Sequence, residues 1–115
     1  DRGEVTYQLA LTYSCDGPVH VELMQGEEGS PWHTANHRGL HHFGVWADDI
    51  GAEVDRLVAD GWTIELAAGT PDERYGRFAY LRSPAGVLVE PVSRNAQPRF
   101  EAWWAGGDLA PAPTR

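Results

Sequence analysis

Residues 39–50 have the sequence GLHHFGVWADDI, and this stretch decides the fold. It predicts a strand over 40–47 that runs into a helix capped by Asp48 or Asp49. Because side chains alternate between the faces of a strand, His42 shares its face with Gly44 and Trp46, and His41 points to the opposite, helix-facing layer. A single histidine at this place is either a metal ligand or a packed imidazole, and the rest of the chain has to decide between them.

The predicted helix is followed by three more strands. Over 48–61, Ile50, Val54, Leu57 and Val58 form one apolar stripe, and Gly61 ends the helix. The strands are expected at 62–66, 77–82 and 87–92, with a tight turn at 83–86. The polar loop 67–76 is expected to fold over a pocket as a lid.

The last two strands form a hairpin that places a carboxylate in mid-strand. A two-residue turn sets Ala79 opposite Glu90 and puts Arg77 on the same face. The remaining side chains would face the helix as core: Phe78, Tyr80, Val87 and Val89. Glu90 has apolar sequence neighbours and therefore needs a partner.

An earlier pair of strands is predicted at 4–13 and 19–25, joined by a turn with Asp-Gly and Pro. We expect Val19, Val21 and Leu23 to face the core. Glu22 then projects from the opposite face of a buried strand, where it also needs a partner. The polar segment 26–38 connects the two halves and carries two histidines, His33 and His37, which we interpret as exposed loop residues.

Composition excludes several classes of protein. The 115 residues are enough for one domain, and 42% are hydrophobic, as in ordinary globular proteins. The net charge of −8 argues against a nucleic-acid or anionic membrane partner. The single cysteine, Cys15, favours a reducing, cytoplasmic location, and no apolar run is long enough to span a membrane. Phe100, Trp103 and Trp104 predict a short amphipathic helix that docks on the sheet or on a second subunit.

The chain resembles the vicinal oxygen chelate superfamily, with the methylmalonyl-CoA epimerase and glyoxalase-like branch most similar. Three segments carry the resemblance: VHVELM (19–24), GLHHFGVWADDI (39–50) and FAYLRSPAGVLVE (78–90). The resemblance implies an α+β fold of paired βαβββ modules, which form a curved mixed sheet around a metal cavity. The strand, helix and strand that open the family's first module have no counterpart in this sequence. The domain 1–115 then divides into a closing hairpin (1–25), a linker (26–38), a complete module (39–93) and a tail with a short helix (94–115).

The resemblance also implies that Glu22, His42 and Glu90 bind a divalent metal ion, with Mn, Fe, Co, Ni, Zn and Mg all left open. His42 is preferred to His41 because the family's ligand lies seven positions before the aspartate that begins the helix. Glu90 would also serve as catalytic base, and Trp46 and Arg77 would bind substrate.

Two classes of function follow from this reasoning. The first is a metal-dependent lyase or isomerase of glyoxalase or epimerase type, which acts on a small carbonyl or carboxylate substrate through an enolate. The alternatives are a metal-free binding protein of the antibiotic-sequestering kind and an extradiol-type dioxygenase. In each case we expect a small-molecule partner and a homodimer.

Overall fold

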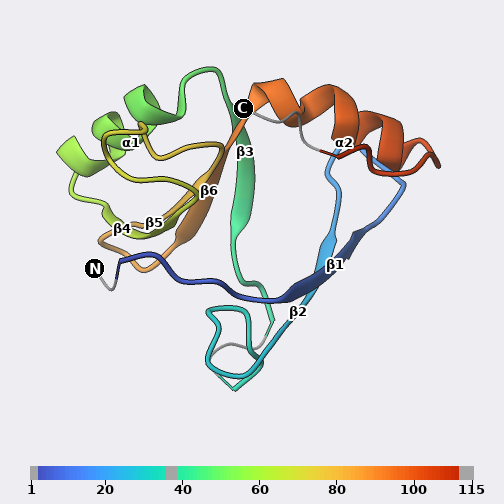
Figure 1. Cartoon of the computed structure of the whole chain (residues 1–115), viewed down its shortest axis with the longest axis horizontal. Coiled ribbons are helices and arrows are strands. Elements are labelled where there is room, and N and C mark those ends of the chain that lie inside the picture. Colours follow the sequence, from blue (N-terminus) through green and yellow to red (C-terminus); the bar gives the residue numbers. More distant parts are fainter. Residues whose placement is uncertain (1–2, 36–38, 112–115) are drawn as a thin grey trace.

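The structure is a computed structural model that describes residues 3–35 and 39–111. Its elements divide between two sheets and two α-helices (Figure 1). In chain order they are β1 (Leu9–Tyr13), β2 (Glu22–Gly26), β3 (Phe43–Ala47), α1 (Ile50–Ala59), β4 (Thr63–Ala67), β5 (Ala79–Arg82), β6 (Leu88–Ser93), a 3₁₀ turn (Arg94–Ala96) and α2 (Gln97–Trp104).

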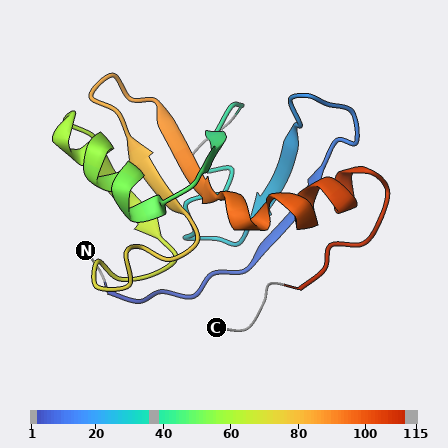
Figure 2. The same ribbon diagram turned by 90° about the horizontal axis from the view of Figure 1, so that it is seen from above.

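Strands β3 to β6 and helix α1 form one complete βαβββ unit. The sheet order is β3-β6-β5-β4, with β3 parallel to β6 and the other pairs antiparallel. Helix α1 covers one face of this sheet, and the separate β1–β2 hairpin lies beyond the other face (Figures 1 and 2). The predicted α+β class is therefore confirmed. The strand expected over 40–47 begins only at Phe43, so both histidines precede it.

Helix α1 has the predicted N-cap and stop signals. The Asp49 side chain accepts a hydrogen bond from the Ala52 amide at 2.9 Å. Gly61 follows the helix with φ of 92°, a conformation that L side chains rarely adopt. The predicted apolar stripe is right for its three buried members, Ile50, Val54 and Leu57. It is wrong for Val58, which is 46% exposed because the sheet reaches only the other side of the stripe.

The register of the β5–β6 hairpin differs by one residue from the predicted one. Leu81 lies opposite Val89, and the turn closes with the Ser83 amide donating to the Val87 carbonyl. Three residues, not two, form the loop, and the third is Gly86 with φ of 91°. A shift of one residue inverts the faces of a strand.

The inverted strand changes which residues form the core. Ala79 and Leu81 are fully buried against α1, together with Val54. Tyr80, predicted as core on the helix side, faces the opposite side of the sheet, and Val87 is exposed. The faces predicted within β6 hold, so Glu90 still points away from α1.

The β1–β2 hairpin is oriented opposite to the prediction. Tyr13 pairs with Glu22 and Leu11 with Met24. Val19, Val21 and Leu23 were expected in the core, but they are 83%, 59% and 65% exposed. Within the described residues, only the face that carries Glu22 is covered by the rest of the chain, and this is why the apolar set lies outside.

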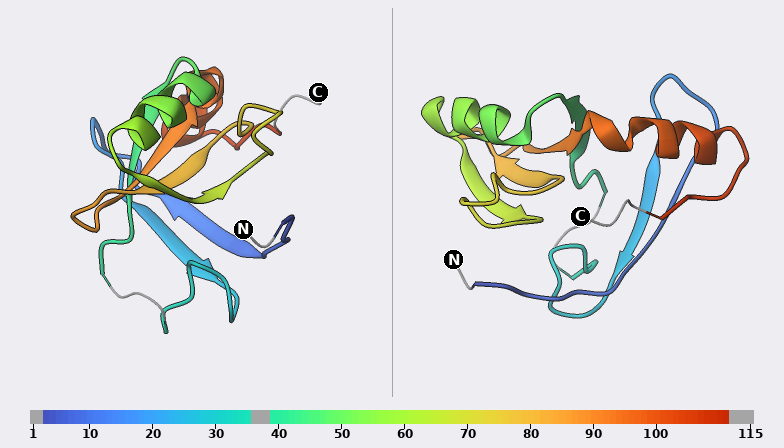
Figure 3. Two further views of the ribbon diagram at one scale, coloured as in Figure 1. Left: turned by 90° about the vertical axis from the view of Figure 1, so that its left-hand side faces the viewer. Right: turned by 45° about the horizontal axis from the view of Figure 1, so that its top comes forward.

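Helix α2 joins the two sheets. It follows β6 after the 3₁₀ turn and runs across to the hairpin of β1 and β2 (Figures 2 and 3). The Tyr13 ring makes edge contacts with Trp103 and Trp104 of α2, and His20 stacks on Trp104 with ring centroids 3.8 Å apart. The predicted amphipathic helix is thus present, and it docks on the hairpin of its own chain.

The loop 67–76 does not cover the face of the sheet that carries Glu90. Tyr75 packs on the α1 side of the sheet, and the Arg74 guanidinium pairs with Asp55 of α1 at 2.7 Å. The prediction that this loop forms a lid, which was based on its polar composition, is therefore wrong for this face. Among the described helices, none is long and apolar enough to cross a membrane.

Candidate metal centre

Three candidate ligands from distant parts of the sequence converge between the two sheets. The Nε2 atom of His42 lies 3.1 Å from Glu90 Oε1 and 3.6 Å from Glu22 Oε2. One ligand atom from each residue lies within 4.8 Å of both others. The three side chains are 5%, 15% and 16% exposed for His42, Glu90 and Glu22, so all are largely removed from water.

Strand pairing explains this convergence. Gly44 pairs with Glu90 across the parallel β3–β6 ladder, and His42 directly precedes the first residue of β3. The ladder therefore brings the start of β3 next to the strand that carries Glu90. Glu22 begins β2 and approaches from the opposite sheet.

Burial and like charge act on the Glu22 carboxyl. Desolvation and the Glu90 carboxylate raise the pKa of Glu22, and the opposing effects of His42 and of a hydrogen bond from the Tyr13 hydroxyl do not cancel this. The pKa of Tyr13 is itself strongly raised by burial and by the two glutamates. Tyr13 therefore remains a neutral phenol and donates to Glu22.

Tyr80 forms a second neutral phenol beside the centre. Its ring packs edge-on against His42 with centroids 4.8 Å apart, and its hydroxyl accepts from Trp32 Nε1 at 3.3 Å. Burial, followed by the Glu90 charge, raises its pKa strongly. Two carboxylates and two neutral phenols thus surround one imidazole.

The raised pKa of Glu22 leads to a stability prediction for the metal-free protein. Glu22→Gln is expected to raise the melting temperature at about pH 7, because burial and the Glu90 charge disfavour the ionised form of Glu22 in the folded state. The folded-state pKa lies above the ordinary value, so this destabilising effect is present at high pH. It disappears near about pH 4 and below, where the carboxyl is protonated in both states.

Thermal unfolding in the presence of a chelator measures this difference at the two pH values. Glu65→Gln is the matched control, because Glu65 is exposed and paired with Arg82. A Glu22→Gln variant that is less stable than the wild type at neutral pH would contradict the electrostatic account.

The donor set fits a divalent ion. Ligand atoms about 2.1 Å from a shared ion at tetrahedral or octahedral angles lie roughly 3.0–3.4 Å apart, close to the two distances around His42 Nε2. Among the described residues, no lysine or arginine forms an ion pair with Glu22 or Glu90. A divalent cation would neutralise these two largely buried carboxylates.

The two residues predicted to bind substrate, Trp46 and Arg77, lie in positions less suited to that role. Trp46 is partly buried and its ring lies 6.0 Å from Phe100 and 6.3 Å from Trp104, so it packs within the α2 cluster. Arg77 is exposed and alternates with Ala79, which faces α1, so the premise that set it beside Glu90 does not hold. Of the two loop histidines, His33 is partly buried, and His37 lies outside the described residues.

His41 does not point to the helix-facing layer as predicted. Its Nδ1 lies 2.9 Å from His42 Nδ1, because both histidines precede β3 and strand alternation does not apply to them. Sequence reasoning also missed Tyr13 and Tyr80. The glycine that ends the 83–86 turn was the available signal for Tyr80, since a three-residue loop turns it toward Glu90.

A pocket of about 550 Å³ opens beside the centre. His41 and Tyr80, which both contact His42, line this pocket. Arg82 also lines it, and the Arg82 guanidinium forms an ion pair with Glu65. The lining includes Tyr7, Pro31, His41, Tyr80, Arg82 and Leu88.

Comparison with protein families agrees with this architecture. The model of the glyoxalase/bleomycin resistance protein/dioxygenase superfamily matches residues 3–80, more than half of the chain. The chain belongs to this superfamily. Comparisons with curated proteins and with solved structures give no match. The superfamily match includes Glu22 and His42 and ends before Glu90, so the place of Glu90 rests on the geometry.

Proposed function

We propose that this superfamily member is a divalent-metal-dependent lyase or isomerase of glyoxalase or epimerase type. The convergence of Glu22, His42 and Glu90 on one centre carries the proposal. Oxygen and imidazole donors suit Mn, Fe, Co, Ni, Zn or Mg. When bound, such an ion supplies a Lewis acid that stabilises the oxyanion of an enolate.

The surrounding side chains would serve proton transfer next to a carbonyl group. Glu90 is the proposed base, because it lies on the sheet face turned toward the hairpin and could take a proton from carbon when it is not held by the metal. Tyr13 and Tyr80 stay protonated, so the side chains that they place beside the site are uncharged and can form hydrogen bonds. The adjoining pocket has room for the part of a small carbonyl or carboxylate substrate that is remote from the metal.

The donor set favours this chemistry over the dioxygenase alternative. Non-haem iron oxygenases characteristically use two histidines and one carboxylate. This centre offers one histidine and two carboxylates. The metal-free binding alternative relies on Trp46 and Trp32 to stack a planar ligand. Trp46 packs with Phe100 and Trp104 of α2, and Trp32 makes edge contacts with Tyr7 and Tyr80. A homodimer remains part of the proposal as the common state of this superfamily.

Metal content is the experiment that tests the proposed function. The purified protein, before and after incubation with Mn, Ni, Co, Fe or Zn, is expected to contain about one divalent ion per chain by elemental analysis. The loaded protein is then incubated in heavy water with small carbonyl and carboxylate compounds, and deuterium is expected at carbon next to the carbonyl. Protein that takes up none of these metals would exclude the proposal.

A further inference from the structure

We propose that His41 is a positioning residue that holds the His42 ring with Nδ1 protonated and Nε2 free to bind metal. This inference rests on the proposed metal centre and adds to it a residue outside the ligand set. It concerns the direction of a hydrogen-bond chain that runs from a backbone carbonyl to the centre.

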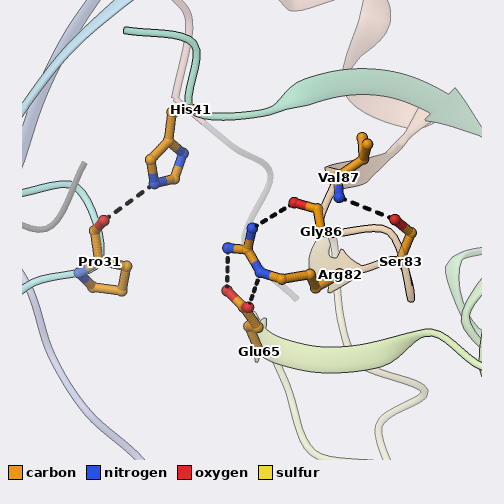
Figure 4. A network of polar contacts seen from close by, with 7 residues as sticks. All are labelled: Pro31, His41, Glu65, Arg82, Ser83, Gly86 and Val87. Atoms are coloured by element: carbon orange, nitrogen blue, oxygen red, sulfur yellow. Dashed lines mark hydrogen bonds and ion pairs between the residues drawn. The ribbon is translucent and has the colours of Figure 1, made fainter. Parts of the chain in front are cut away.

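The chain of contacts is continuous. His41 Nε2 lies 3.1 Å from the Pro31 carbonyl oxygen, and Figure 4 shows the ring facing this carbonyl. His41 Nδ1 lies 2.9 Å from His42 Nδ1. The other nitrogen of His42, Nε2, lies 3.1 Å from Glu90 and 3.6 Å from Glu22.

The donor and acceptor chemistry of each atom gives this series of hydrogen bonds one direction. A carbonyl oxygen only accepts, so His41 Nε2 must carry the hydrogen that reaches Pro31. In a neutral imidazole the other nitrogen is then an acceptor, so His41 Nδ1 accepts from His42 Nδ1–H. With Nδ1–H of His42 donated to His41, Nε2 is the ring nitrogen that remains to bind a metal ion, and it lies at the point where the two carboxylates converge.

The backbone carbonyl that begins this chain is held in place by a compact turn. The fully buried Ser30 donates from its hydroxyl to the Glu27 carbonyl at 2.7 Å, and its amide donates to the same oxygen at 3.1 Å. Gly26 lies against this turn so closely that an added Cβ would lie 2.7 Å from Trp32 Cβ. The segment around Pro31 is therefore tied to the end of β2.

Tyr80 limits rotation of both imidazoles. Its ring makes edge contacts with His42 and His41, with centroids 4.8 Å and 6.2 Å apart. Trp32, the residue after Pro31, donates to the Tyr80 hydroxyl. The same short segment thus anchors the acceptor carbonyl and the aromatic ring that packs against the histidines.

An outer hydrogen-bond partner of this kind fixes the tautomer and orientation of a ligating histidine and increases its basicity. Removing such a partner typically weakens metal affinity by about 10–100-fold. The usual partner is a carboxylate, a backbone carbonyl or water. Here the partner of His42 is a second histidine, His41, which is itself hydrogen-bonded to the Pro31 carbonyl.

Two variants of His41 separate this role from simple packing. His41→Phe keeps an aromatic ring and removes both nitrogens, whereas His41→Asn restores an acceptor near the position of Nδ1. His33→Phe is the matched control, because His33 lies in the same connecting segment and its Nδ1 accepts only from the Ala35 amide among the described contacts. Zinc affinity is measured by calorimetry, and the ring nitrogens are assigned by long-range ¹H–¹⁵N NMR on metal-free and zinc-loaded protein.

The wild type is expected to show a bare Nδ1 on His41 and a protonated Nδ1 on His42. His41→Phe should weaken zinc binding by about 10–100-fold, His41→Asn should recover most of the affinity, and His33→Phe should match the wild type. A protonated Nδ1 on wild-type His41, or unchanged zinc affinity in His41→Phe, would overturn the inference. A wild type that binds no zinc or other divalent ion would overturn the proposed function, and the metal-free spectra would still decide the direction of the chain.

Discussion

His42→Ala is expected to abolish stoichiometric binding of divalent metal. The His42 Nε2 atom lies 3.6 Å from Glu22 and 3.1 Å from Glu90, so its removal leaves the ligand set with two carboxylates and no nitrogen donor. The loss should exceed the about 10–100-fold effect typical of an outer-shell partner, because a direct ligand is removed. Calorimetric titration with Zn²⁺ and elemental analysis measure the effect.

Folding must be separated from binding in this experiment. His33→Ala serves as the control, since His33 lies away from the three ligands in the connecting segment. Circular dichroism should show that His42→Ala keeps its secondary structure, and Glu90→Gln, which preserves shape, should also lose metal. Retention of about one ion per chain by a folded His42→Ala variant would show that the ion binds elsewhere.

Leu81→Ala is expected to destabilise the protein by about 2–5 kcal/mol, as large-to-small substitutions do at fully buried leucines. Leu81 has no exposed surface and packs with Val54 and Ala79 between β5 and α1. The cavity would lie in the part of the core that supports β6 and hence Glu90. Urea unfolding followed by circular dichroism gives the difference in the free energy of unfolding.

Leu23→Ala is the matched control for this change. Leu23 is 65% exposed on the outer face of β2, so the same substitution there is expected to change stability by about 0.5 kcal/mol or less. A large loss at Leu23 with a small loss at Leu81 would contradict the hairpin faces and register described above.

Local patterns were enough to predict the element types, and the resemblance to the superfamily implied the three candidate ligands. The stripe of Ile50, Val54 and Leu57 with its aspartate cap specifies α1, since helix periodicity and capping are encoded within a few residues. Glu22 and Glu90 were recognisable because carboxylates in apolar strands require partners. The helix stripe and the faces of Glu22 and Glu90 survive the error in hairpin register, because each depends on periodicity within its own element.

Contacts across the fold decided the rest. The extra residue in the β5–β6 loop, with Gly86 at positive φ, turned Tyr80 toward Glu90 and set Leu81 against α1. Which face of β2 is buried depended on the elements available to cover it, and here the described chain covers the Glu22 side. His41 contacts His42 in the segment that precedes β3, where the alternation of a paired strand does not set the side-chain directions.

The residue patterns therefore indicated a βαβββ unit, and the resemblance to the superfamily indicated a candidate Glu-His-Glu centre. The tertiary structure alone decided which side chains surround that centre: the two neutral tyrosines, the second histidine and the carbonyl of Pro31. The two kinds of feature differ in the distance along the chain over which their physical causes act. Helix caps and strand alternation act over a few residues, whereas hairpin register and sheet packing depend on loop geometry and on which surfaces find a partner.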